Sequence, residues 1–132
     1  MSAKGWSPDL QAIKLTYDYA IHGGAVGTIA LGNLPDGFVV NHCYAIAETA
    51  LTGGGTMVVG EDGGGDADGY FTDIDAITTS AAVKGSGALV NSTGDEVFHV
   101  VAAAKDGVQI TIASTGYTAG KVHFVFIGSQ PY

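Results

Sequence analysis

The stretch that most constrains the fold is residues 95–126, where two turn signals separate three extended segments. In the first segment, side chains alternate between the two sides of an extended chain: Val97, His99, Val101 and Ala103 on one side, Phe98, Val100 and Ala102 on the other. Lys105-Asp106-Gly107 interrupts this run, and residues 108–112 alternate again. Asp-Gly between two such runs is a strong hairpin signal, because a type I′ turn needs positive φ at both central residues. A second turn at 118–120 precedes a third segment, 122–127. We therefore expect a three-stranded antiparallel meander that the rest of the chain covers.

Similar short segments, each ended by a glycine-rich turn, occupy the rest of the chain. Residues 13–22 alternate with period two, which predicts one half-buried strand. Leu34-Pro35-Asp36-Gly37 has the composition of a tight turn and leads into a long strand over 38–51. Along that strand, period two places one set of side chains together: Phe38, Val40, His42, Tyr44 and Ile46. About eight strands result, so we predict an all-β fold, an antiparallel two-sheet β-sandwich of jelly-roll-like type.

The chain divides into a short arm and one domain. Its 132 residues suffice for a single domain with a core of its own. Residues 1–10 show no periodicity, whereas 11–132 carry all the predicted strands, so we expect an N-terminal arm followed by one β-sandwich domain. Lys4, Trp6 and Leu10 are the residues of this arm that we expect to bind a partner, although Trp6 folded back onto its own domain is an equal alternative.

Charge and cysteine content restrict the function. The net charge is −8, and five lysines with no arginine supply all the fixed positive charge. Proteins that bind nucleic acid or anionic membranes rely on clustered Lys and Arg, so we expect neither type of partner. Cys43 is the single cysteine, which rules out an intrachain disulfide. The N-terminus lacks the apolar run of a signal peptide, so we expect synthesis in a cytoplasm without standard export.

One acidic loop is the strongest candidate for a metal. Asp62, Asp66 and Asp68 lie in a glycine-rich stretch, residues 60–69, and Asp66-Ala67-Asp68-Gly69 resembles the middle of a calcium loop. Alignment on Gly69 fails the full EF-hand pattern, since Gly64 would occupy the first ligand position. A calcium site of another type and a solvated turn are the two interpretations that remain.

The sequence contains few residue patterns typical of metal sites or of catalysis. None of the four histidines, His22, His42, His99 and His123, has a local metal-ligand partner, although His99 and His123 could be cross-strand neighbours in the meander. Cys43 lies in an apolar strand without a neighbouring base, which predicts a buried small side chain. No nucleophile, paired-carboxylate or phosphate-loop signature occurs. We therefore predict that the protein is not an enzyme and needs no cofactor.

A set of aromatic residues allows a different function. They could form a platform for sugars, but strands place core residues in the same pattern: Tyr17, Tyr19, Phe38, Tyr44, Tyr70 and Phe71.

The order of motifs resembles a family of bacteriophage proteins. The motifs are turn and strand signals that run through most of residues 13–128: Gly27-Thr28-Ile29-Ala30-Leu31-Gly32, then Leu34-Pro35-Asp36-Gly37-Phe38-Val39-Val40, then Gly55-Thr56-Met57-Val58-Val59-Gly60, then Asp66-Ala67-Asp68-Gly69-Tyr70-Phe71, and finally Thr118-Ala119-Gly120-Lys121. This order is similar to that of the head decoration (cement) proteins, and related head-fibre base domains, of tailed bacteriophages.

The resemblance implies a structural function. It implies a β-sandwich that sits on the outside of a capsid, contacts the major capsid protein and often forms a homotrimer. We therefore expect a virion protein of the capsid surface, made in the host cytoplasm, that stabilises the head without catalysis. The alternative is a receptor- or glycan-binding module of a head fibre or tail, using loops around residues 60–70 and 81–92.

Overall fold

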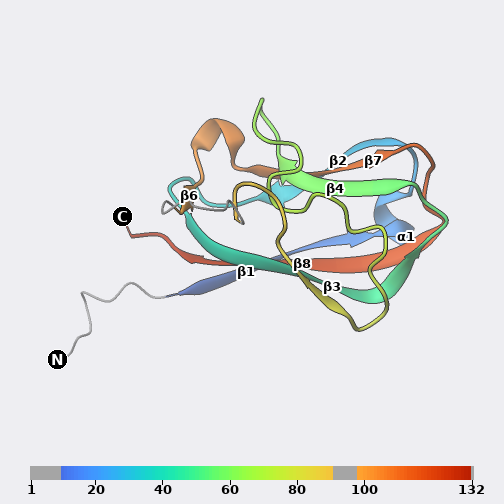
Figure 1. Cartoon of the computed structure of the whole chain (residues 1–132). Helices are drawn as coiled ribbons and strands as arrows, with labels where there is room; N and C mark the ends of the chain where they lie inside the picture. The colour runs from blue at the N-terminus through green and yellow to red at the C-terminus, as the bar shows by residue number, and fades with distance from the viewer. Residues whose placement is uncertain (1–9, 91–97, 132) are drawn as a thin grey trace.

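The computed structural model describes residues 10–90 and 98–131, and it confirms the two-sheet antiparallel β-sandwich with eight strands (Figure 1). A short helix α1 and a 3-10 turn η1 complete it. The elements in chain order are β1 (Gln11–Asp18), α1 (Tyr19–His22), β2 (Gly27–Asn33), β3 (Val39–Thr52), β4 (Thr56–Glu61), β5 (Ala82–Lys84), β6 (His99–Val100), η1 (Ala103–Lys105), β7 (Gly107–Ala113) and β8 (Ala119–Ser129).

The two sheets differ in size. Sheet A has the order β1-β8-β3-β5, and β6 also pairs with β3. Sheet B has the order β2-β7-β4. Figure 1 shows the two sheets stacked, with α1 at one end of the molecule and β6 at the other. All the strand pairs within these sheets are antiparallel.

Strand β8 lies inside sheet A, where it pairs with β1 on one side and β3 on the other. Val122, Phe124 and Phe126 are buried between the sheets, and Lys121 and His123 alternate with them on the outside. The inward aromatic rings meet residues from the segment after β4: Phe126 lies 4.9 Å from Tyr70, centroid to centroid, and Phe124 lies 5.5 Å from Phe71. Offset and edge contacts of this kind add to the stabilisation that burial of the rings supplies.

The predicted meander is wrong. Its first segment shortens to β6, which pairs with β3, while β7 lies in sheet B and β8 in sheet A. Residue Val97 of that segment lies outside the described residues. The predicted I′ turn is also absent, because residues 103–105 form η1 and Asp106 has φ −76° and ψ −10°. Alternation identifies extended chain correctly here, but it does not specify which strands pair.

The first predicted strand ends four residues early. β1 stops at Asp18, and residues 19–22 form α1 instead of continuing the strand. The Asp18 carboxylate accepts a hydrogen bond from the backbone N–H of Ala20 at 3.0 Å and so caps the helix. Gly23 ends the helix with φ 74°, a conformation that favours glycine.

A bulge divides the long strand β3 and corrects its predicted face. The pairing with β8 shifts between Val40 and His42, so Asn41 is an extra residue. Val40 is buried between the sheets, whereas His42, Tyr44 and Ile46 fall on the outer side of sheet A. The five side chains that strict alternation groups on one face are therefore divided between two faces.

The segment after β4 fills the space between the two sheets. Tyr70 and Phe71 are both fully buried, and Phe71 forms a bridge with Val59 of β4. Ile74 and Ile77 are also buried, joined by a single turn in which the Ile77 N–H donates to the Ile74 carbonyl at 3.0 Å. This irregular segment supplies four large side chains to the core.

Candidate functional site

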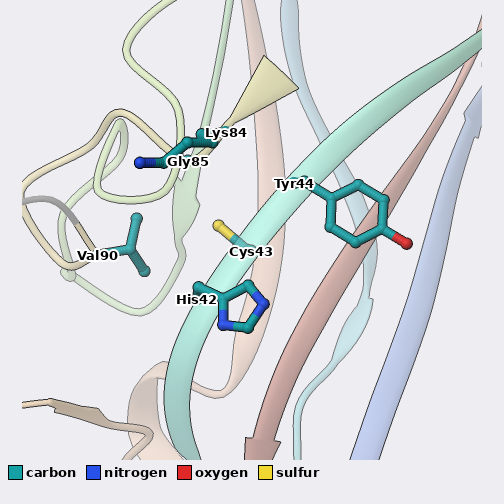
Figure 2. Close-up of a pocket in the computed structure, with 6 residues that line it drawn as sticks. All are labelled: His42, Cys43, Tyr44, Lys84, Gly85 and Val90. Carbon is teal, nitrogen blue, oxygen red and sulfur yellow. The ribbon is translucent and has the colours of Figure 1, made fainter. Parts of the chain in front are cut away.

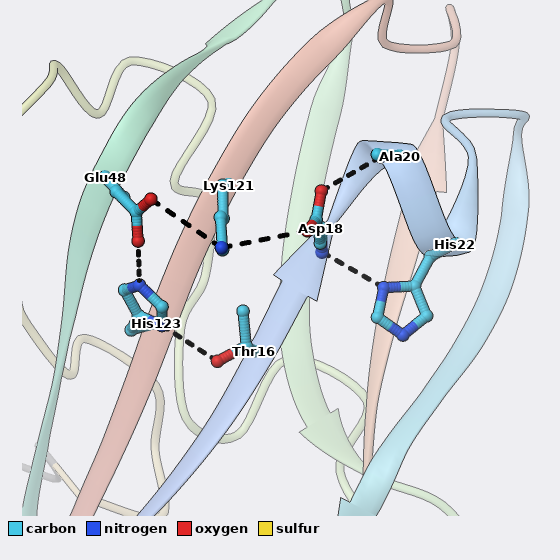
Figure 3. Close-up of polar contacts among 7 residues, drawn as sticks. All are labelled: Thr16, Asp18, Ala20, His22, Glu48, Lys121 and His123. Carbon is cyan, nitrogen blue, oxygen red and sulfur yellow. Dashed lines mark hydrogen bonds and ion pairs between the residues drawn. The ribbon is translucent and has the colours of Figure 1, made fainter.

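A polar cluster lies on the outer side of sheet A and joins its strands β1, β8 and β3 (Figure 3). His123, on the central strand, has its Nδ1 2.8 Å from Thr16 Oγ1 and its Nε2 2.8 Å from Glu48 Oε1. Lys121 Nζ lies between two carboxylates, 3.6 Å from Glu48 and 3.9 Å from Asp18. Thr16 pairs with His123 and Asp18 with Lys121 in the register of the sheet. Sheet geometry therefore brings together residues that are up to 107 positions apart in sequence.

The charges of the cluster act on Glu48. The hydrogen bond from His123 is the largest cause that lowers the pKa of the Glu48 carboxyl, and the positive charge of Lys121 lowers it further. Both contacts favour the ionised form of a carboxyl group. Glu48 itself is more than half exposed, at 57%, so water screens these interactions.

Hydroxyl, imidazole and carboxylate stand here in the same order as in a nucleophilic triad. Thr16 lies within β1, which pairs along its whole length with β8, and Glu48 lies on β3. The cluster therefore joins three strands of sheet A with hydrogen bonds.

A second ionisable pair lies between the sheets. Glu61 of β4 is only 4% exposed, and its Oε2 lies 2.7 Å from His99 Nε2 of β6. The His99 ring also packs edge-on against Tyr70, with centroids 6.0 Å apart. This pair connects sheet B to sheet A, because β6 pairs with β3. His99 and His123, considered above as possible neighbours, thus contact different carboxylates.

A pocket of about 360 Å³ opens at the edge of sheet A (Figure 2). β5 pairs with residues 44–46 of β3 and β6 pairs with residues 39–40, and the pocket lies beside the part of β3 between them. Its lining residues are His42, Cys43, Tyr44, Lys84, Gly85 and Val90. In Figure 2 the Cys43 sulfur points toward Val90 and Gly85, and the Tyr44 ring points away from it.

Cys43 is a packing residue of this pocket. Its side chain is 3% exposed, as the apolar sequence around it predicts, and burial raises the pKa of the thiol to about 12. Because the thiolate is the reactive form, a thiol with this pKa is a poor nucleophile near neutral pH.

The three aspartates of the acidic loop do not surround one point. The Asp62 backbone N–H donates to the Gly107 carbonyl at 3.0 Å, while the Asp68 N–H lies 3.4 Å from the Asp66 carboxylate. A side-chain hydrogen bond with Asp66 is the main reason that the pKa of Asp68 is raised. Within residues 10–90 and 98–131, no three His, Cys, Asp or Glu side chains are grouped so that they could hold a metal ion.

The predicted partner-binding arm is described only at its last residue. Lys4 and Trp6 lie outside the described residues. Leu10, directly before β1, has 65% of its surface exposed. Phe98 and Val100, at the same end of sheet A, are 60% and 48% exposed, so large apolar side chains gather near the start of β1 and at β6.

The aromatic residues considered as a sugar platform are mostly in the core. Four of the six are fully buried: Tyr17, Phe38, Tyr70 and Phe71. Tyr44 faces outward from β3 and Tyr19 is 38% exposed at α1, on a different element. The six side chains do not form one exposed surface.

Sequence reasoning missed both ionisable clusters because each is built across strands. Thr16, Glu48 and His123 occupy outward positions of three strands, and no local spacing reports their proximity. Alternation within each strand could identify them as outward residues, but their meeting depends on the strand order β1-β8-β3.

Comparisons with known proteins relate the fold to phage capsids. The chain resembles a chain in the capsid asymmetric unit of cyanophage Pam1, with a TM-score of 0.71, 18% identity and coverage of 99% of this chain and 91% of that one. It also resembles a chain in the acidic stable capsid structure of Helicobacter pylori bacteriophage KHP30, with a TM-score of 0.64, 12% identity and coverage of 93% and 89%.

A third likeness is to a chain in the capsid of Ralstonia phage GP4, with a TM-score of 0.63, 18% identity and coverage of 94% and 86%. No protein-family model and no curated protein sequence matches the chain. At these identities the likenesses establish the fold. In the described part of the chain, no helix is long and apolar enough to cross a membrane.

Proposed function

We propose that the protein is a structural component of a bacteriophage virion that binds the outside of the capsid and stabilises it, without catalysis. The observation that carries this proposal is the likeness of nearly the whole chain to chains in three phage capsid structures. The likeness also covers more than 85% of each of those chains, so it is not confined to a small part of them. The motif order of the sequence independently resembles head decoration proteins.

The exposed apolar residues at one end of sheet A support a role in assembly. Leu10, Phe98 and Val100 are each about half or more exposed, and exposed apolar groups of this kind mark interaction surfaces when they gather in one region. The major capsid protein is the partner that we propose, with Lys4, Trp6 and Leu10 as the arm that reaches it. An arm and a compact domain that bind neighbouring subunits together gain affinity through multivalency.

A homotrimer is the oligomer that we propose. β1 and β5 are edge strands of sheet A, and β2 and β4 are edge strands of sheet B. Exposed edges present unpaired backbone groups, which a closed cyclic oligomer can cover. Light scattering of the purified chain should give three times the 13.3 kDa chain mass, and a monomer would remove this part of the proposal.

Co-sedimentation tests the function. Heads of the phage that encodes the chain are prepared without it, and the purified protein is added to assembled heads and, separately, to unassembled capsid subunits. We expect the protein to pellet with the heads and to leave the subunits unbound. If it stays in the supernatant with intact heads over a wide range of concentrations, the proposal is wrong.

A further inference from the structure

The outer faces of the two sheets differ in composition. On sheet B, the outward residues are mainly small or polar: Thr28, Ala30, Thr56, Val58, Gln109, Thr111 and Ala113. On sheet A, the outward centre is apolar: Tyr44, Ile46, Val125 and Ile127, with Ala12 and Ala82 beside them. An antiparallel sheet with one face in water normally carries polar residues there. The composition of sheet A is that of a face covered by something else.

The apolar centre continues to the exposed end of the sheet. Val39 of β3 pairs with Val100 of β6, which is 48% exposed, and with Ser129 of β8. Leu10, 65% exposed, precedes the first residue of β1, which pairs with Gly128 at the same end. The apolar surface therefore extends from the middle of sheet A to the end where β1 begins.

Charge distinguishes this face from the rest of the molecule. Three of the four described lysines lie on its strands: Lys14, Lys84 and Lys121. Only two of the ten described acidic residues, Asp18 and Glu48, lie there. The other eight are in loops and turns or, in the case of Glu61, buried between the sheets. In a chain of net charge −8, this is the face that an acidic partner can approach.

Two of the lysines stand at the margins of the apolar centre. The strand register places Lys14, Val125, Tyr44 and Lys84 in one row across the sheet, with a lysine at each edge. Within residues 10–90 and 98–131, neither Lys14 nor Lys84 has a carboxylate at ion-pair distance. Lys121, in contrast, is already neutralised by Asp18 and Glu48.

We infer that the outer face of sheet A is the surface by which the protein binds the capsid shell, and that it fits a protein surface with an apolar centre and carboxylates at its margin. The inference rests on the proposed function and adds to it the contact face and the chemistry of the partner. Tyr44, Ile46 and Val125 form the desolvated centre, and Lys14 and Lys84 pair with the partner's carboxylates.

The pocket beside β3 borders this face. Its lining includes Tyr44 and Lys84 of the row described above, together with His42, which is also outward. Interfaces concentrate their binding energy in a few side chains that fill well-packed pockets. A partner side chain that enters here would meet Cys43 and Val90, which are apolar, and Lys84, which is charged.

Charge-introducing variants with matched controls test the inference. Ile46→Glu and Val125→Glu place a carboxylate in the centre of the face. Val58→Glu makes the same change at a comparable half-buried outward position of sheet B. Lys14→Glu and Lys84→Glu reverse the charge at the margin of the face, and Lys105→Glu in η1 is their control. Circular dichroism and thermal melting first establish that each variant is folded, and binding to undecorated heads is then measured by co-sedimentation.

We expect Ile46→Glu and Val125→Glu to weaken binding at least about tenfold, as loss of a central contact does. Lys14→Glu and Lys84→Glu should weaken it by a smaller factor, most strongly at low salt. Val58→Glu and Lys105→Glu should bind as the unmodified chain does. Two centre variants are made, so that the test still stands if one of them does not fold.

Other outcomes contradict the inference in separable ways. If the unmodified chain binds heads and the sheet A variants bind equally well, the contact lies elsewhere while the proposed function stands. Loss of binding in Val58→Glu alone would assign the contact to sheet B. If Ile46→Glu lowers the mass of the protein in light scattering, a second copy of the chain occupies the face. If the unmodified chain fails to bind heads, the proposed function falls together with this inference.

Discussion

At the scale of single residues, the sandwich depends on ionisable groups that alternation along one strand does not reveal. Glu61 and His99 come from different sheets and form one short contact where almost no water reaches the carboxylate. Glu48 and His123 form a contact of similar length on an open surface. The same pair of side-chain types therefore has different energetic consequences in the two places.

Removal of His99 should destabilise the protein strongly. In His99→Ala the buried Glu61 carboxyl loses its hydrogen-bond partner, which costs about 1–3 kcal/mol in the free energy of unfolding. The double variant Glu61→Met/His99→Leu removes both polar groups and should be more stable than His99→Ala. Urea denaturation of the three proteins measures both effects. A His99→Ala protein that unfolds at the same urea concentration as the original would contradict this role of the pair.

The surface cluster should be visible in the titration of Glu48. Because its pKa is lowered in the folded chain, its contribution to stability is complete above the pKa of an unfolded Glu. That contribution is lost as the pH falls through the lowered folded value. NMR titration of the carboxyl should show the lowered pKa, a large return toward the ordinary value in His123→Ala, and a smaller return in Lys121→Ala. A larger effect of Lys121→Ala would show that charge, and not the hydrogen bond, dominates.

At the scale of the elements, strand alternation predicts burial well where the strand is regular and fails at irregularities. β8 is regular over its inward residues, and Val122, Phe124 and Phe126 are buried as period two requires. In β3 the extra residue Asn41 reverses the side on which Tyr44 and Ile46 emerge relative to Val40. Nothing in the local sequence marks that bulge, so the apolar outer face of sheet A could not be predicted.

The pairing of the strands is the second feature that the sequence does not predict. Three consecutive extended segments with turns between them suit a meander, but β7 crosses to sheet B, where its Val108, Ile110 and Ile112 fill the core from the other side. The class of fold and the number of strands follow from the turns and the alternation. The partners of each strand, and with them the polar cluster of sheet A, depend on contacts between distant segments.

Two neighbouring residues of β8 should contribute very different amounts to the free energy of unfolding. Phe126→Ala removes a fully buried ring in contact with Tyr70 and should cost about 3–5 kcal/mol. Val125→Ala, on the half-buried outer side, should cost about 1 kcal/mol or less. Equilibrium unfolding in urea measures both values. Equal losses would mean that the outer face of sheet A is packed as tightly as the core, contrary to the structure.

At the scale of the whole molecule, the chain combines a well-filled sandwich with two unlike outer faces. One face carries mainly small or polar residues, and the other carries an apolar centre, lysine margins and an adjacent pocket. The acidic loops lie outside the second face. A molecule with this distribution is suited to attach to another protein surface through one side.

The measurement that tests the central claim most directly is a cryo-electron microscopy reconstruction of phage heads that lack this protein, before and after the purified chain is added. We predict additional density on the outside of the shell, of the size and shape of the two-sheet sandwich, with sheet A toward the capsid subunits. Reconstructions that are identical before and after addition would contradict the proposal that the protein is a structural component of the capsid surface.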